Sequence, residues 1–457
     1  EICACLVGSE MCIRDSYKVP ASITLPGGGT APLTALESGK TLTLNLALTR
    51  DGVTLTTGDI AAWDTQGTIN GEINIGGGDT PTDGNIDMTA MDAAGVKAAI
   101  DAAITAGITE FKLTGPIANL GIKEDYTQST GNPFYNTGVT KVDLSGVTGW
   151  QTVAYSNFPD VTSSVAGLPA YTFYRCAALT EVVLPAEVKA IGAGAFTNCT
   201  SLSTINLKDV THIGKQAFGF CEALTVVDLS AVINLYMEAF QETDLTALSL
   251  PEVLAISDGL TANNLGSHTG SFGDCKSLVS VNAPKLTSTG YKSFSGCSAL
   301  TALTLPALTE INDQAFYSCK KLTTENEGFG FAKKVTTVGE DAFGYCTGLT
   351  NPELPKATLI NSRAFTGCTA MESLKLPEAT KFGNYIVNRC KSLTRIEATA
   401  SGAFTDDSGD LSLNVMAVFG NQGNTGDPFD AANCALVLNA DKNTSGTGSP
   451  TVNGTTW

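Results

Sequence analysis

Histidine, tryptophan and charged side chains are scarce in this chain. It has 457 residues but only two histidines and three tryptophans, and charged residues make up 16%. His212 and His268 are far apart in the sequence, so neither a zinc set nor a Ser-His-Asp triad is expected. Gly-x-Ser-x-Gly, Gly-x-x-x-x-Gly-Lys-Ser/Thr and Gly-x-Gly-x-x-Gly motifs are missing. The sequence therefore predicts a non-enzymatic protein with no cofactor and no metal site.

Basic residues are the second shortage. The chain carries 27 Lys and Arg against 45 Asp and Glu, which gives a net charge of -18. Nucleic acids and anionic membrane surfaces bind clustered Lys and Arg, so neither is an expected partner. No run of 18 or more apolar residues is present, and no transmembrane span is expected.

Residues 1–16 fit nothing that follows them. They lack the basic start and apolar segment of a signal peptide, and EICACLVGSEMCIRDS resembles translated sequencing-adapter sequence. We expect this segment to be non-native, so that Cys3, Cys5 and Cys12 have no function and the export signal is missing from this chain. The alternative is a Cys-x-Cys metal or redox motif, although no His lies nearby.

A β pattern covers residues 17–78. Residues 41–49 alternate apolar and polar side chains, Asp51-Gly52 predicts a turn, and the pattern continues through Trp63. We expect a small antiparallel sheet that forms part of an all-β sandwich. The order of these motifs resembles the closing strands of fimbrillin-like domains in Bacteroides-type bacteria, and the resemblance implies a partial domain of that type.

A linker at residues 79–88 precedes a predicted helix over residues 89–106 and a strand over residues 108–113. Thr89 or Asp92 is expected to cap the helix, and we interpret residues 89–133 as the N-terminal cap of the array that follows. Asp79, Asp83 and Asp87 present a Ca²⁺ alternative, but their spacing departs from the usual calcium loop and favours a solvated linker.

The rest of the chain is organised around one repeated phrase. The phrase Ala-Phe-x-x-Cys-x-x-Leu recurs with small changes, mostly at intervals of 22 residues. A fixed period of this length predicts a solenoid, in which each unit buries its apolar face against its neighbours. We count about eleven units over residues 134–400, in which the phenylalanines are Phe134, Phe173, Phe196, Phe218, Phe240, Phe272, Phe294, Phe316, Phe343 and Phe365.

Each unit predicts one short strand. Leu300, Leu303 and Leu305 point inward in one representative unit, and Pro306 ends the strand because it has no N–H. Five or six buried side chains at roughly 1.5–3 kcal/mol each cannot offset the ordering of a whole unit at about 1–2 kcal/mol per residue. No unit is therefore expected to fold alone.

This pattern resembles the BspA-like (Treponema pallidum-type) leucine-rich repeats of bacterial surface proteins. The resemblance covers residues 134–400, and it implies an α/β repeat fold, the leucine-rich-repeat solenoid. It also implies a cell-surface or secreted adhesin, not an enzyme, that binds host matrix proteins or other cells.

Three insertions interrupt the period, at Trp150–Pro169, Ser257–Gly270 and Glu325–Lys334. Insertions into repeats form loops on one face and often carry binding residues. Tyr155, Phe158, Phe329 and Phe331 lie in them and are candidate exposed anchors for a partner. The alternative is that these aromatic side chains fold back onto the solenoid wall.

Nine cysteines occupy one position of the repeat: Cys176, Cys199, Cys221, Cys275, Cys297, Cys319, Cys346, Cys368 and Cys390. A metal or disulfide stack is one interpretation, but side chains in register point the same way, which favours small buried fillers. Residues 401–457 are interpreted as a C-terminal cap and tail, in which Asp406, Asp407 and Asp410 present a second Ca²⁺ alternative to a solvated loop.

The outward positions of the repeat strand supply the remaining candidates for protein binding. A Thr-rich column accompanies them, so we expect a flat, polar, mildly acidic face; the alternative is that Thr merely suits strand surfaces. The candidate residues are Asp143, Asn206, Asp228, Asn282, Asn326, Glu353 and Lys375.

Three hypotheses follow for function. The first is a surface adhesin that binds a protein through the strand face and the inserted loops. The second is an architectural spacer or fimbria-associated subunit without its own ligand. The third is a carbohydrate-binding module, which clustered exposed aromatic residues would favour.

Overall fold

A computed structural model describes residues 83–153, 165–256, 270–324 and 329–399, together with the backbone of strands outside these ranges. The chain divides into two compact units, residues 1–80 and 81–457. Some residues singled out from the sequence lie outside the described residues, and the predictions for them are not tested. They are Cys3, Cys5, Cys12, Asp79, Tyr155, Phe158, His268, Asn326 and the three aspartates after residue 401.

The first unit contains only strands among its described segments. β1 (Ser22–Leu25) pairs with β2 (Gly29–Pro32), and β3 (Lys40–Thr49), β4 (Gly52–Ala62) and β5 (Thr65–Ile69) form a second sheet in that order. Both sheets are antiparallel, and Thr49 of β3 pairs with Gly52 of β4. This pairing agrees with the antiparallel pattern expected here, while the all-β sandwich and its fimbrillin-like interpretation stay predictions.

The second unit begins with a strand-helix-strand element. β6 (Asn85–Asp87) leads through the 3-10 turn η1 (Met88–Ala90) into α1 (Ala93–Thr105), and β7 (Glu110–Pro116) returns parallel to β6. Asp92 caps α1, because its carboxylate accepts a hydrogen bond from the Gly95 N–H at 2.7 Å. β7 also pairs with β8 (Lys141–Thr148), so this element covers the open face of the first repeat.

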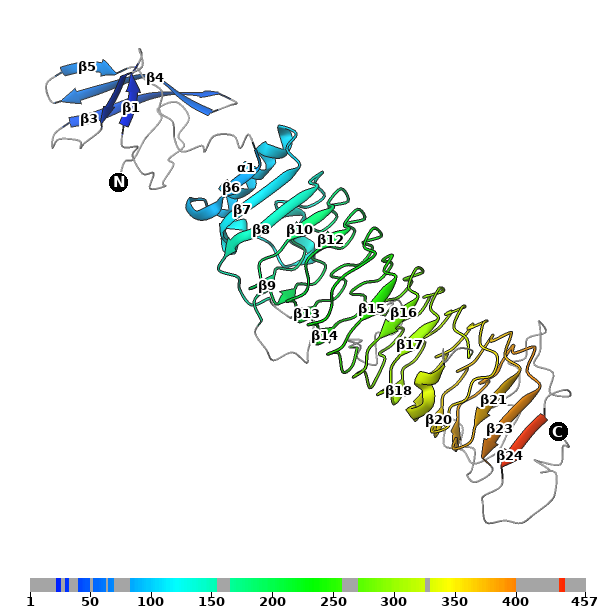
Figure 1. The fold of residues 1–457 in the computed structure, drawn as a ribbon. Coiled ribbons are helices and arrows are strands. Elements are labelled where there is room, and N and C mark those ends of the chain that lie inside the picture. The colour runs from blue at the N-terminus through cyan, green and yellow to red at the C-terminus, as the bar shows by residue number, and fades with distance from the viewer. Residues whose placement is uncertain are drawn as a thin grey trace. The chain divides into compact units, whose positions relative to one another are not determined.

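The repeats then stack into two rows of short parallel strands (Figure 1). The first row continues the predicted Leu strands: β8, β10 (Glu181–Val183), β12 (Thr204–Ile205), β15 (Ala247–Ser249), β16 (Ser280–Asn282), β17 (Ala302–Thr304), β21 (Ser373–Leu376), β23 (Arg395–Thr399) and β24 (Ala435–Asn439). The second row was not anticipated: β9 (Gly167–Leu168), β11 (Ala190–Ile191), β13 (His212–Ile213), β14 (Asn234–Leu235), β18 (Glu310–Ile311), β19 (Thr337–Val338), β20 (Leu359–Ile360) and β22 (Lys381–Phe382). Many repeats thus contribute two strands where one was predicted.

Three further 3-10 turns are η2 (Ile117–Leu120), η3 (Tyr126–Gly131) and η4 (Gly330–Lys334).

A column of phenylalanine rings fills the space inside the array. From Phe173 to Phe365, consecutive rings lie 5.0–5.6 Å apart with interplanar angles of 3–14°. Phe240 and Phe272 are separated by an insertion, yet their rings lie 5.6 Å apart at an angle of 5°. The core geometry is therefore independent of how many residues connect two neighbouring units.

Each repeat cysteine is buried and bonded to the preceding unit. The thiol of Cys199 donates to the carbonyl oxygen of Phe173 at 3.0 Å, and the same contact recurs for all nine repeat cysteines at 2.6–3.2 Å. All nine are free thiols, and none of the described residues forms a cluster suited to a metal ion. The interpretation as buried fillers agrees with this burial, but it missed the hydrogen bond.

The turn around each Phe has an unusual backbone. Gln216 and Phe220, two residues before and after Phe218, have left-handed φ values of 53° and 62°. Such values cost non-glycine residues energy, and they persist only when the surroundings stabilise them. Here the N–H groups of Gln216, Phe218 and Phe220 all donate to carbonyl oxygens of the next repeat at 2.8–3.1 Å.

Candidate functional site

The outward positions predicted for protein binding lie along the first row of strands. Asp228, Asn282, Glu353 and Lys375 are exposed. Parallel register places Ser249, Asn282 and Thr304 side by side on β15, β16 and β17. The same strands bury Leu248, Val281 and Leu303, so the outward side chains stand on a continuous apolar core.

Three of the predicted residues make local hydrogen bonds. The amide of Asn206 bonds both the N–H and the C=O of Leu184 at 2.9 Å, and so extends the strand pairing. Asp143 accepts from the Ser145 N–H at 2.8 Å and lies 3.8 Å from Lys112. Asp228 accepts from the Ser230 N–H at 3.0 Å, which holds the pKa of its carboxyl below the ordinary value. Their oxygens are thus already engaged within the protein.

The Thr column stabilises the array itself. The hydroxyl of Thr180 donates to the carbonyl oxygen of Thr140 at 2.8 Å, and that of Thr394 donates to Glu372 at 3.1 Å. A second Thr column accompanies the other row of strands, where Thr309 donates to Thr287 and Thr336 donates to Thr309. These contacts favour the alternative that Thr occupies these positions because it suits the strand surface, and not because it binds a partner.

Two large apolar side chains are exposed beside the first row of strands. Val226 is 72% exposed and lies two residues before the exposed Asp228. Val279 is 46% exposed and directly precedes Ser280, the first residue of β16, at the position of the Thr column. The neighbouring outward residues on β15 to β17 are the uncharged Ala247, Ser249, Ser280, Asn282, Ala302 and Thr304. We name these six residues with Val226, Asp228 and Val279 the central strand face. Sequence reasoning missed the valines because both occupy positions that other repeats fill with small or polar residues.

The expectation that Phe329 and Phe331 are exposed anchors is wrong. Both side chains are buried, and their rings lie 5.1 Å from each other. Phe331 also packs 5.6 Å from Phe316, and Phe329 packs 5.3 Å from Phe343. The insertion therefore adds two buried rings beside the phenylalanine column, where they pack on Phe316 and Phe343.

A tyrosine cluster at the start of the array is a further feature that sequence reasoning missed. Tyr126, Tyr171 and Tyr174 contact one another edge to face with centroids 5.8–5.9 Å apart, and Arg175 lies over the ring of Tyr174 at 5.3 Å. Because the rings use their faces on one another, the cluster mainly holds η3 against the first turns.

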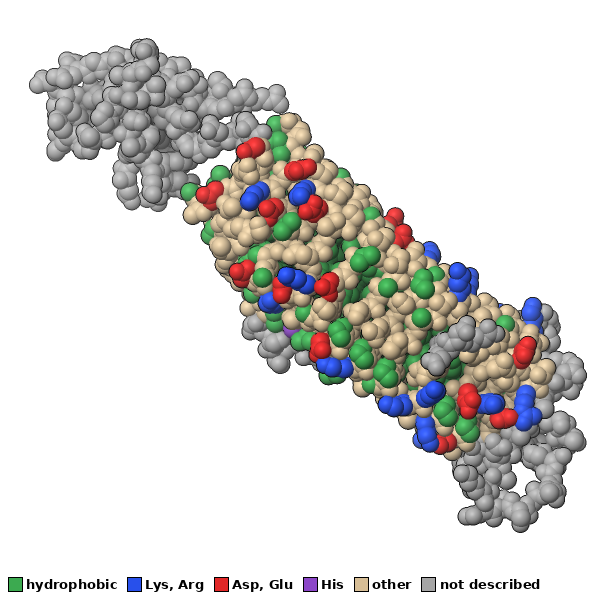
Figure 2. All heavy atoms as spheres, in the orientation of Figure 1, with side chains coloured by type: hydrophobic (Ala, Val, Ile, Leu, Met, Phe, Trp, Pro, Cys, Tyr) green, Lys and Arg blue, Asp and Glu red, His purple; other side chains and the backbone are tan. Residues whose placement is uncertain are grey.

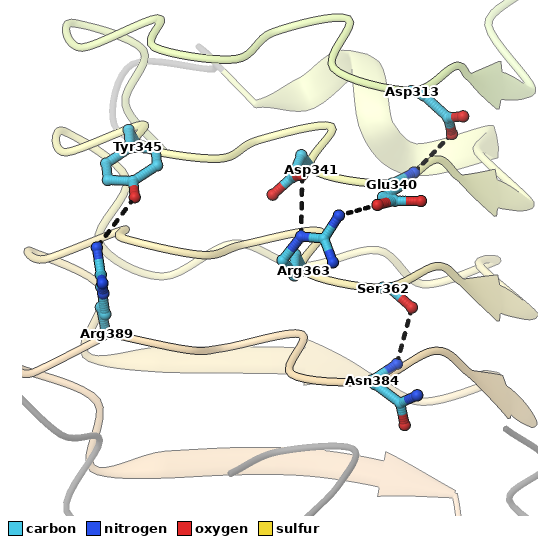
Figure 3. A network of polar contacts seen from close by, with 8 residues as sticks. All are labelled: Asp313, Glu340, Asp341, Tyr345, Ser362, Arg363, Asn384 and Arg389. Carbon is cyan, nitrogen blue, oxygen red and sulfur yellow. Dashed lines mark hydrogen bonds and ion pairs between the residues drawn. The ribbon is translucent and has the colours of Figure 1, made fainter. Parts of the chain in front are cut away.

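A polar network crosses the repeats near the C-terminal end of the array (Figure 3). Arg363 contacts Glu340 and lies 3.1 Å from Asp341, while Arg389 donates to the hydroxyl of Tyr345 at 3.3 Å. Burial raises the pKa of Asp341 to about 6, Asp313 adds to the rise, and a hydrogen bond from Gln314 opposes it. The acids and bases pair within the network, so it stabilises neighbouring turns and offers no reactive centre.

These features define a repeat protein of the leucine-rich-repeat class, with rows of parallel strands and, among the described residues, no group of side chains suited to a metal ion. The model of the BspA type leucine rich repeat region matches residues 151–265, 261–355 and 324–402. The matches span more than half of the chain, which therefore belongs to the BspA type leucine-rich-repeat family. No helix in the part of the chain that the structure describes is long and apolar enough to cross a membrane.

Several solved structures are similar to this chain. A leucine-rich repeat protein from Bacteroides ovatus shares 23% identity over 55% of this chain and 80% of its own, with a TM-score of 0.28. The Treponema pallidum leucine-rich repeat protein shares 25% identity over 36% of this chain and 72% of its own, with a TM-score of 0.30. A leucine-rich cell surface protein from Faecalibacterium prausnitzii shares 17% identity over 81% and 96%, with a TM-score of 0.29. No curated protein sequence matches this chain.

Proposed function

We propose that this protein is a secreted or cell-surface bacterial adhesin that binds a protein partner through the central strand face. The observation that carries the proposal is the exposure of Val226, and of Val279 at the start of β16, beside outward strand residues that are small and uncharged apart from Asp228. Protein interfaces place apolar side chains at their centre and exclude charge from it. Membership of a surface-protein repeat family supports the same role.

The candidates at Glu353 and Lys375 extend this surface toward the C-terminal repeats. The two residues are joined by a parallel bridge, and both are exposed. Charges at the rim of an interface influence the association rate and the choice of partner more than affinity. We therefore assign them to the rim and the valines to the centre of the proposed interface.

The test is binding of the full chain to a panel of host matrix proteins and mucins at low and physiological salt. The double variant V226D/V279D places carboxylates on the central strand face. The matched control I233D/L254D alters two residues from the second row side, which are 43% and 61% exposed. We expect saturable binding that the first variant reduces at least tenfold and the control leaves within threefold.

Two outcomes would contradict the proposal. Binding that both variants weaken equally would place the interface elsewhere. A lack of binding to every protein in the panel would favour the architectural spacer, which polymerisation of the isolated chain would then support.

A further inference from the structure

Basic residues are distributed unevenly along the array. Residues 83–256 contain 8 Lys and Arg against 18 Asp and Glu, whereas residues 270–399 contain 14 against 11. The face in Figure 2 shows basic side chains concentrated toward the C-terminal part. The second half of the array is thus the cationic part of a chain whose net charge is -18.

One edge of this half carries lysines without ionic partners. Lys276, Lys320 and Lys391 directly follow the repeat cysteine, and Lys321 follows Lys320. All four are exposed, and none forms an ion pair with another described residue. By contrast, Lys285 and Lys356 on another edge pair with Glu252 and Glu378. We name the four unpaired residues the lysine edge.

The repeat geometry arranges these lysines in a row. Each cysteine thiol is bonded to the preceding Phe carbonyl, which fixes the residues after it in register. Neighbouring strands lie about 4.8 Å apart, so Lys276 and Lys320 are about 10 Å apart along the array, and Lys391 follows about 14 Å further. Ser298, Thr347 and Thr369 occupy the positions between them.

One hydroxyl residue therefore separates Lys276 from Lys320 along this edge, and two separate Lys320 from Lys391. The side chains of Ser298, Thr347 and Thr369 form no hydrogen bond with another described residue. Acidic residues occupy the same edge only at the boundaries, at Asp244 and Asp274 before the row and at Glu372 beside its last part. The row offers widely spaced positive charges with hydrogen-bonding groups between them.

We propose that the lysine edge binds a linear anionic polysaccharide, with one carboxylate or sulfate for about every two strand separations. A folded protein is a poorer fit, because Lys is depleted from protein interfaces. In addition, none of the described residues that follow Val279 in the sequence is a large exposed hydrophobic residue. A nucleic acid is also a poorer fit. The closely spaced phosphates of a nucleic acid would be repelled by the acidic residues of the chain, whose net charge is -18. Nucleic-acid bases also need exposed aromatic rings on which to stack.

This site goes beyond the proposed protein-binding role and uses none of its residues. The central strand face ends at Thr304 and lies on strands, whereas the lysine edge lies on the turns that follow the cysteines. The two sites can therefore be tested, and can fail, independently of each other.

The experiment measures binding of the full chain to size-defined chondroitin sulfate and polygalacturonate between 50 and 300 mM salt. Dextran serves as the uncharged polymer, and single-stranded DNA serves as the nucleic-acid probe. The variant K276Q/K320Q/K321Q/K391Q removes the row. The control K333Q/K334Q/K356Q/K381Q removes the same charge from exposed lysines elsewhere in the same half, outside both proposed sites.

We expect at least one anionic polysaccharide to bind with an affinity that falls with salt, and the first variant to lose at least tenfold while the control changes less than threefold. The variant K276R/K320R/K321R/K391R keeps the four positive charges and should retain binding. That result would show that the Gln variant loses binding through lost charge and not through a folding defect. Failure of both polymers to bind the unaltered chain, equal losses in the two Gln variants, or tighter binding of DNA would overturn the proposal.

Discussion

The thiol of Cys297 lies 3.1 Å from the carbonyl oxygen of Phe272, one repeat earlier, while the ring of Phe272 lies 5.5 Å from the ring of Phe294. The same Phe carbonyl also accepts the N–H of Cys275 in its own repeat. A single backbone oxygen thus links two units, and the cysteine contributes both volume and a hydrogen bond to the junction.

Replacement of this thiol should weaken the junction. We expect C297A to lower the free energy of unfolding by about 1–2 kcal/mol, because a small cavity forms and the Phe272 carbonyl loses a donor. C297S keeps a donor and should lose less than C297A. Urea unfolding followed by circular dichroism measures both variants, and a smaller loss for Ala than for Ser would show that the hydrogen bond is unimportant.

Loss of one ring from the phenylalanine column should be severe. Phe294 is fully buried between Phe272 and Phe316, so we expect F294A to cost about 3–5 kcal/mol. Y126A removes a ring that is 57% exposed and should cost less than about 1 kcal/mol. Thermal unfolding of the two variants tests this difference, and similar midpoints would contradict the dependence on burial.

The repeat thiols should resist alkylation in the folded protein. Burial raises the pKa of Cys275 to about 11 and that of Cys346 to about 12. At pH 8 roughly one Cys275 thiol in a thousand and about one Cys346 thiol in ten thousand are then ionised, and the thiolate is the reactive form. Hydrogen bonding from Cys199 lowers the pKa of Cys176, so Cys176 should be the first repeat cysteine to react. Mass spectrometry after iodoacetamide treatment, with and without urea, checks both statements; rapid labelling of Cys346 in the folded state would refute them.

The stability of the C-terminal repeats should depend on the protonation of Asp341. Its pKa is raised to about 6 when folded, so the native state binds a proton more tightly than the unfolded state does. The free energy of unfolding contributed by this group is therefore highest below about pH 4 and falls, by at most about 3 kcal/mol, as the pH rises to about 6.

D341N should remove that part of the pH dependence, and Asn can still accept the hydrogen bond from Arg363. The control is D228N, because the pKa of Asp228 is lowered and its contribution has the opposite sign. Unfolding midpoints between pH 4 and 7 report both variants. Parallel curves for D341N and the unaltered protein would show that Asp341 does not titrate differently on folding.

Much of the array could be predicted because identical side chains must stack. The Phe, Cys and Leu positions are spaced evenly, so burial and strand register follow directly from the period, and Asp92 was correctly among the expected helix caps. The linker and domain boundaries proposed from composition remain predictions.

The rest could not be predicted because periodicity reports burial and not bonding geometry. Nothing in the sequence marks Phe220 as left-handed, since its φ of 62° is held by hydrogen bonds to the next repeat. Asn206 looks like a free surface amide until Leu184 is placed beside it. Phe329 and Phe331 look like exposed loop residues until their packing on Phe316 and Phe343 is known.

The ring spacing in the phenylalanine column stays the same at insertions, and this has a consequence for how such genes evolve. Phe316 and Phe343 are 27 residues apart in the chain, yet their rings lie 5.6 Å apart at 7°, as they do between units without an insertion. A stretch of codons added between two core positions can therefore lengthen a connection while the spacing of the rings on either side is kept. Recombination within the gene can lengthen such connections, and the added residues can themselves join the core, as Phe329 and Phe331 do.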